Sequence, residues 1–153
     1  MTVIVSMLRK PHKEIPMLNT AVRTAGGAMP AAKKTSTIFW PDDMPEVYGM
    51  ICDGDCLSPE ITHGTTLVFD RDEPVQAGDF VALFWKPEHV RDGEHQVAVK
   101  RLVIGPPPWG RFGEAVGGEL APMIVVEMLN PPRQFAVRCD MLLGLHKCKG
   151  PMR

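Results

Sequence analysis

The sequence predicts a mainly β fold, a sandwich or partly closed barrel of short strands that follows an extended N-terminal arm. Three observations predict it. From about residue 46 onward, apolar runs of four to nine residues alternate with turn-forming residues, which is typical of β-strands. The close spacing of these runs favours a sandwich or barrel over parallel βαβ units. The first 45 residues, in contrast, contain five prolines, a density that forbids a long helix.

The chain therefore divides into an extended arm, residues 1–45, and a β-domain, residues 46–153. Within the arm, only residues 17–25 leave room for a few helical turns. The prolines and the Gly26-Gly27 pair suit an extended segment rather than a folded unit such as a helix-turn-helix domain.

The strands of the β-domain are expected where Val, Leu, Ile, Phe and Met are concentrated. The expected strands are residues 47–52, 66–70, 79–86, 96–104, 123–129 and 141–147, with 135–137 as a weaker one. Glycine, aspartate and proline turns separate these runs, among them Asp53-Gly54, His63-Gly64 and Asn130-Pro131-Pro132. The stretches 87–95 and 105–118, which are poor in core residues, are expected to be surface loops.

Composition excludes several classes of function. The formal net charge is −1, so no global field attracts the protein to nucleic acid or to an acidic membrane, and direct DNA binding is not expected. No apolar run approaches the roughly 20 residues that span a bilayer. We therefore expect a cytoplasmic protein, without a membrane anchor, whose four cysteines are reduced thiols.

A structural zinc site is the alternative use of those cysteines. The candidate ligands are Cys52, Cys56, Cys139, His146 and Cys148. Their spacings, Cys-x3-Cys and Cys-x6-His-x-Cys, are not the tight pairs of zinc modules. No metal or other cofactor is expected, and Cys52 and Cys139 are expected to be core residues.

The most informative segment is residues 54–61, Gly-Asp-Cys-Leu-Ser-Pro-Glu-Ile, followed by Gly64. It resembles the motif Gly-Asp-Ser-Met-x-Pro-x-Ile, then Gly-Asp, of the LexA/UmuD-like self-cleaving peptidase family. Cys56 takes the place of the serine, and Thr65 replaces the second aspartate. Three further blocks follow in the family's order: Ala-Gly-Asp-Phe-Val-Ala at 77–82, Val-Lys-Arg-Leu at 99–102, and Leu-Asn-Pro at 129–131 followed by the run 142–146. The resemblance covers about residues 46–149.

The resemblance implies a LexA/signal-peptidase-like β-domain with Cys56 as nucleophile and Lys100 as its base. A peptide bond is attacked by a group that has first lost its proton. A serine needs a neutral lysine, which burial favours by penalising the charged form. A thiol is far more acidic, so a thiolate beside an ammonium is also a competent pair. Family members commonly cut their own arm between Ala and Gly upstream of the catalytic domain, and Ala25-Gly26 is the one such bond before residue 46.

The turn before Cys56 is expected to prepare the site. Gly54 supplies backbone freedom, and the backbone amides of Asp55 and Cys56 are candidates for an oxyanion hole. Ser58-Pro59 is typical of a helix start, with serine as cap. Such a helix would direct the positive end of its dipole at Cys56.

The absence of a DNA-reading module makes the UmuD branch the nearest resemblance. That branch implies a homodimer, cleavage prompted by a RecA filament, and contact with an error-prone DNA polymerase, in a chromosomal SOS response or a prophage system. The alternative is a catalytically inactive module of the same fold that serves dimerisation or interaction. A membrane-bound signal peptidase shares the Ser–Lys chemistry, but no membrane anchor is found in the sequence.

Overall fold

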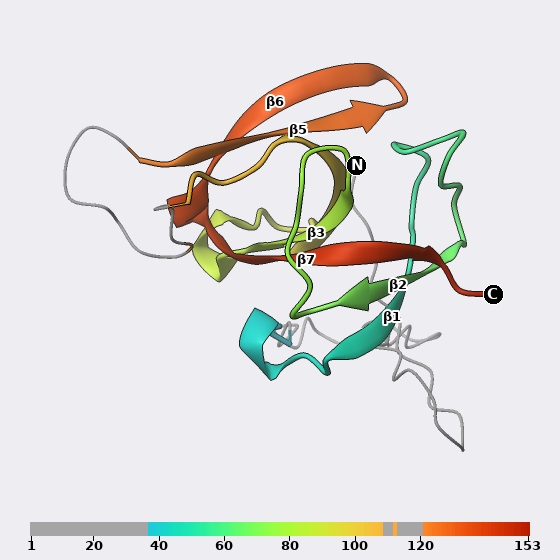
Figure 1. The fold of residues 1–153 in the computed structure, drawn as a ribbon, viewed down its shortest axis with the longest axis horizontal. Coiled ribbons are helices and arrows are strands. Elements are labelled where there is room, and N and C mark those ends of the chain that lie inside the picture. Colours follow the sequence, from blue (N-terminus) through green and yellow to red (C-terminus); the bar gives the residue numbers. More distant parts are fainter. Residues whose placement is uncertain (1–36, 109–111, 113–120) are drawn as a thin grey trace, which may run out of the picture.

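The computed structural model describes residues 37–108, 112 and 121–153 (Figure 1). In these residues the chain is mainly β, as predicted: seven antiparallel strands form one sheet, in the order β1-β2-β7-β3-β4-β5-β6. The strands are β1 (Val47–Ile51), β2 (Thr66–Asp70), β3 (Phe80–Trp85), β4 (Val97–Ile104), β5 (Met123–Leu129), β6 (Pro132–Arg138) and β7 (Leu142–Pro151). The sheet is open, with β1 and β6 at its two edges.

The helical segments of the described residues are three single turns of 3₁₀ helix, η1 (Pro41–Asp43), η2 (Pro87–His89) and η3 (Cys139–Met141). None of the helices in this part of the chain has the length and apolar character that crossing a bilayer requires.

Every expected strand is present, and the differences lie at the ends. β2 and β5 have the expected bounds, whereas β6 spans Pro132–Arg138 instead of 135–137 and β7 continues to Pro151. β6 pairs with β5 along its whole length, from Leu129↔Pro132 to Met123↔Arg138. It is an edge strand and mostly exposed, so its residues lack the apolar content by which strands are recognised in a sequence.

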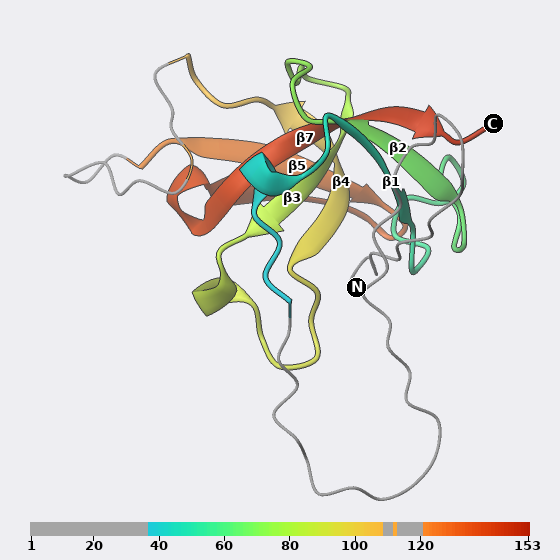
Figure 2. The ribbon, with the colours of Figure 1, turned by 90° about the horizontal axis from the view of Figure 1, so that it is seen from below.

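Two hydrophobic clusters lie on opposite faces of the central strand β3. Ala82 and Phe84 belong to the cluster that includes the residues of β1 and β2, while Val81 and Leu83 belong to the cluster with β5 and the start of β7. Figures 1 and 2 show why both faces are covered: the sheet is strongly twisted, so that β5 and β6 pass on one side of β3. A strand buried on both faces reads as a continuous apolar run, which is what residues 80–85 are.

The packed body includes residues just upstream of position 46. Pro41 and Met44 are buried, and Pro41 lies so close to Gly144 of β7 that a Cβ at position 144 would meet it at 3.2 Å. Arg71 Nη1 donates hydrogen bonds to the carbonyl oxygens of Met44 at 2.7 Å and Asp42 at 3.2 Å. These contacts hold η1 against the sheet. The predicted arm up to residue 36 lies outside the described residues, as does most of the predicted loop 105–118.

Candidate active site around Cys56 and Lys100

The loop between β1 and β2, residues 52–65, carries the candidate nucleophile. Two backbone hydrogen bonds of 2.8 Å, from Cys52 N to Thr65 O and from Gly64 N to Cys52 O, close the loop at its base. Gly54 has φ +103°, a conformation that residues with a side chain rarely adopt, so the expected backbone freedom at this position is used. The loop is therefore a defined structure that positions Cys56.

The helix predicted to begin at Ser58-Pro59 is not formed. Residues 56–60 make successive turns instead, with hydrogen bonds from Ser58 N to Asp55 O and from Ile61 N to Leu57 O, both 3.0 Å. The chain has only the span from Ile51 to Thr66 in which to leave β1 and re-enter β2. Within it, Leu57 and Ile61 must both enter the core, where they are 0% and 4% exposed. A helix dipole directed at Cys56 was thus a wrong prediction.

The structure brings Cys56 and Lys100 together. Lys100 Nζ lies 3.5 Å from Cys56 Sγ and 3.2 Å from the carbonyl oxygen of Val99, and donates a hydrogen bond to each. Both side chains are buried, with 1% exposure for Cys56 and 5% for Lys100. The two residues lie 44 positions apart in the sequence, so the fold alone creates this contact.

The register of β4 explains the burial of Lys100. Lys100 pairs with Val81 of β3. Because β5 lies on the other side of β4, Lys100 belongs to an interior strand of the sheet rather than to an edge strand. Its neighbours Val99 and Leu102 are fully buried. Side chains alternate between faces along a strand, so Leu102 shares the face of Lys100 while Val99 lies on the other. The dry surroundings expected for the lysine are present.

The backbone of Cys56 is fixed from the end of β5. Its carbonyl oxygen accepts hydrogen bonds from Leu129 N at 2.8 Å and from Asn130 N at 3.1 Å. Arg101, next to Lys100, forms ion pairs with Glu127 of β5 and with Glu60 of the loop. The loop is therefore attached to β4, which carries the lysine, and to β5 next to it. These attachments fix the backbone on which the contact between sulfur and amine depends.

The amides proposed for an oxyanion hole carry no competing partner in the described part of the chain. Neither Asp55 N nor Cys56 N donates a hydrogen bond to another described residue, whereas Gly54 N donates to His63 Nδ1 at 3.1 Å. Unpaired backbone donors beside a nucleophile are what stabilisation of an oxyanion requires. Among the described residues, no histidine forms a hydrogen bond with Cys56, so lysine is its ionisable partner.

A surface groove of about 600 Å³ lies beside the lysine. Lys100 contributes to its wall, but Cys56 does not. Apolar side chains, among them Trp85, Met128, Phe135 and Met141, form much of this wall. Besides Lys100, the wall contains four basic side chains and a single carboxylate, namely His89, Arg91, His95, Arg133 and Glu94. The amine thus connects the buried sulfur to a groove large enough for a few residues of an extended peptide.

The cysteines considered as zinc ligands are separated by the sheet. Cys52 and Cys56 belong to one hydrophobic cluster and Cys139 to the other. Within residues 37–108, 112 and 121–153, no group of three His, Cys, Asp or Glu side chains has the geometry of a metal site. Cys52 and Cys139 are 1% and 0% exposed core residues. Burial raises the pKa of Cys52 to about 11, so this thiol stays protonated at neutral pH.

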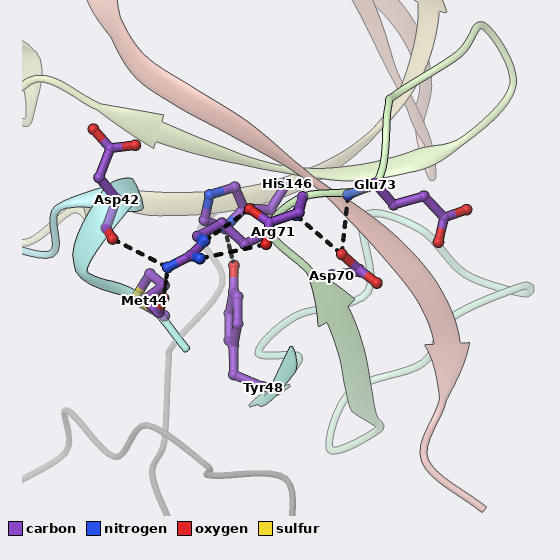
Figure 3. A network of polar contacts seen from close by, with 8 residues as sticks. Asp42, Met44, Tyr48, Asp70, Arg71, Glu73 and His146 are labelled. Carbon is purple, nitrogen blue, oxygen red and sulfur yellow. Dashed lines mark hydrogen bonds and ion pairs between the residues drawn. The ribbon is translucent and has the colours of Figure 1, made fainter. Parts of the chain in front are cut away.

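Sequence reasoning missed a second buried polar pair, which Figure 3 shows. Tyr48 of β1 and His146 of β7 share a hydrogen bond of 2.6 Å between the tyrosine hydroxyl and Nδ1 of the imidazole, next to the Arg71 network that holds η1. Burial, together with the charge of Arg71, lowers the pKa of His146 from 6.5 to about 4. His146 stands in an ordinary apolar run, and no local pattern in the sequence signals its partner 98 positions away.

The remaining predicted site residues, Ala25 and Gly26, lie outside the described residues. Comparison of the chain with family models, with curated proteins and with solved structures gives no match.

Proposed function

We propose that this protein is a self-cleaving regulator of the LexA/UmuD-like type, in which Cys56 and Lys100 hydrolyse a bond of the chain's own arm, with Ala25-Gly26 as the candidate. One observation carries the proposal: a buried sulfur and a buried amine, from two sequence blocks that resemble that family, lie 3.5 Å apart. The mainly β body supports it as well.

The reaction follows from the positions of the two side chains. Lys100 Nζ takes the proton of the Cys56 thiol, and the sulfur attacks the carbonyl carbon of the scissile bond. The backbone amides of Asp55 and Cys56, which have no partner among the described residues, stabilise the oxyanion that forms. The lysine then gives the proton to the leaving amine, and water hydrolyses the thioester. The hydrogen bond to Val99 O keeps the amine beside the sulfur in the resting state.

The groove beside Lys100 is the proposed path of the arm. Its apolar side chains, among them Trp85 and Phe135, suit an extended segment with small side chains. Alanine and glycine at the scissile bond let the backbone approach the buried sulfur closely. The basic partner of the reaction, Lys100, forms part of the same wall, which links the binding of the arm to the chemistry.

The biological setting is proposed from the resemblance alone. It comprises a homodimer in the cytoplasm, a RecA filament that prompts cleavage, and an error-prone polymerase whose contact depends on whether the arm is intact. No cofactor is part of the proposed reaction. Light scattering of the full chain tests the homodimer, with a mass of one subunit as the contradicting result.

The deciding experiment is intact-mass spectrometry of the full chain after incubation at mildly alkaline pH, with and without a RecA filament. We expect fragments 1–25 and 26–153, and their loss in Cys56→Ala and in Lys100→Ala. The matched control is Cys52→Ala, since Cys52 is an equally buried cysteine of the same loop and its variant retains cleavage. An intact mass under all conditions, or equal cleavage in Cys56→Ala, overturns the proposal.

A second candidate, a non-catalytic interaction module, is favoured by the low exposure of Cys56, which is 1%. A nucleophile in this state cannot meet a peptide carbonyl until side chains move. Cys56→Ser separates the two functions. If the serine variant cleaves itself while the natural chain does not, the fold is competent and the natural protein acts by binding.

A further inference from the structure

The pairing of a sulfur with an amine gives this site a chemistry that a serine–lysine pair lacks. A hydroxyl cannot be oxidised to a sulfenic acid, whereas a thiol can. Lys100 Nζ, at 3.5 Å from Cys56 Sγ, is in hydrogen-bond contact with that sulfur. Because its second hydrogen bond, to Val99 O, lies at 3.2 Å, the amine is held where it would meet an oxidised sulfur first.

The other thiol of the loop, Cys52, is poorly placed to compete. Its Sγ is directed to the carbonyl oxygen of Gly54, at 3.9 Å. Burial is the main cause that raises its pKa to about 11, and a protonated thiol is a weak nucleophile because the thiolate is the attacking species. Attack of Cys52 on an oxidised Cys56 is therefore slow, and a disulfide between the two is the competing product that the test has to distinguish.

We propose that Cys56 and Lys100 form an oxidation site, in which hydrogen peroxide converts the pair into a reversible sulfur–nitrogen cross-link. In the first step the Cys56 thiol and hydrogen peroxide give the sulfenic acid and water: the sulfur is oxidised by two electrons and the O–O bond is reduced. In the second step the neutral amine of Lys100 attacks the sulfenic sulfur. The S–N bond forms, the S–O bond breaks, and the departing hydroxide takes one amine proton and leaves as water.

Access and reversal follow from the same geometry. The groove of about 600 Å³ whose wall contains Lys100 brings a molecule as small as hydrogen peroxide to this lysine, and Cys56 Sγ lies 3.5 Å from its amine. A thiol reductant reverses the cross-link: the first thiol attacks Cys56 Sγ and releases the amine, and a second restores the free cysteine. The cross-link joins the β1–β2 loop to β4, so it also fastens two segments that lie 44 positions apart in the sequence.

The consequence for activity rests on the proposed function. A single bond would occupy the nucleophile and its base together, so the oxidised protein is inactive in self-cleavage and regains activity with a thiol reductant. The oxidation of Cys56 and its cross-link to Lys100 do not depend on self-cleavage. If the protein forms the cross-link but never cleaves its arm, the proposed function is wrong and the oxidation site still stands.

The test is to treat the full chain with hydrogen peroxide, block free thiols, and measure the intact mass and a peptide map. We expect a mass lower by two hydrogen atoms and a linked species that joins the peptides containing Cys56 and Lys100, which a thiol reductant removes. The same two peptides joined with one extra oxygen atom also contain the cross-link, as a sulfinamide or an N–O–S bridge formed with a second molecule of hydrogen peroxide. The Cys52→Ser variant is the matched control and keeps the linked species, whereas Lys100→Arg loses it entirely and accumulates sulfenic or sulfinic acid at Cys56.

Three results overturn the inference. The first is a linked species that joins Cys52 to Cys56 and vanishes in Cys52→Ser, which identifies a disulfide. The second is sulfinic acid at Cys56 of the natural chain without any linked peptide. The third is a natural chain that peroxide leaves unchanged. Because the peptide map of the natural chain distinguishes these results, the test does not depend on the folding of any variant.

Discussion

The buried His146 makes the folded protein sensitive to mild acid. Burial lowers the pKa of this imidazole from 6.5 to about 4, its ring is 3% exposed, and Phe84 lies against it with ring centroids 4.7 Å apart. Nδ1 of the ring and the Tyr48 hydroxyl share a hydrogen bond of 2.6 Å. One unit of pKa difference corresponds to about 1.4 kcal/mol, so the whole difference is worth about 3 kcal/mol of unfolding free energy.

The sign follows from which state binds the proton. The folded-state pKa is depressed, so on acidification the unfolded chain takes up a proton that the folded chain refuses. The free energy of unfolding therefore falls as the pH falls. The contribution of His146 is complete above pH 6.5 and is lost progressively towards pH 4, the two pKa values being 6.5 and about 4. Between pH 6.5 and pH 5 the expected loss is about 2 kcal/mol, in a range where most carboxylates of the unfolded chain are still ionised.

The assay is urea unfolding followed by tryptophan fluorescence, in buffers from about pH 7 to about pH 5. His146→Gln is expected to abolish most of the pH dependence, since glutamine keeps a hydrogen-bond partner for Tyr48 but does not titrate. His95→Gln is the control, because burial also lowers the pKa of His95 while this ring is less deeply buried. A free energy of unfolding that stays constant over this range, or that falls equally in His146→Gln, would refute the reasoning.

Three further predictions concern the site and its loop. Leu57→Ala, which empties a fully buried position, is expected to lower the free energy of unfolding by about 2–5 kcal/mol, measured by urea unfolding; a loss below 1 kcal/mol contradicts the anchoring role. Gly54→Ala, at φ +103°, is expected to cost about 1–3 kcal/mol and to slow self-cleavage, and a variant with unchanged stability and rate rules out this turn as a constraint. Lys100→Met replaces a buried amine by a thioether of similar length, so thermal stability should stay within about 1.5 kcal/mol of the natural chain. The same variant is expected to slow the alkylation of Cys56 by a thiol reagent, and unchanged alkylation would show that the amine does not activate the sulfur.

The strands were predictable because burial leaves a direct trace in the sequence. β3 and β4 occur as apolar runs bounded by turn residues, since side chains on both of their faces are covered. β6 was predicted only in part, since an edge strand with exposed side chains carries little of that signal. The end of β7 was missed for a similar reason: Lys149 and Gly150 resemble a turn, yet Gly150 pairs with Val68 of β2 and Lys149 lies at the shift in register next to it.

The site was predictable as a pair of residues but not as a local structure. The contact between Cys56 and Lys100 was inferred from the resemblance of sequence blocks, and no periodicity of this chain alone predicts it. The turns of residues 56–60 replace a helix that serine and proline would favour by their local preferences. Tertiary demands prevail there, because Leu57 and Ile61 must both reach the core within a short loop. The Tyr48–His146 pair left no trace at all, since it depends on the register of two strands far apart in the sequence.

The geometry also determines what must move if Cys56 is to meet the proposed scissile bond. The carbonyl oxygen of Cys56 is held by two amides from the end of β5, and hydrogen bonds close the base of its loop, so the backbone is the less mobile part. Lys100 is the residue of the pair that lines the groove, and its side chain has several rotatable bonds. A rotation of Lys100 that exposes the sulfur to the groove also breaks the 3.5 Å contact between Sγ and Nζ. The resting contact and the open site are then alternative states. An occupant of the groove that pushes the amine aside exposes the sulfur, and an oxidant that joins the two atoms prevents that opening.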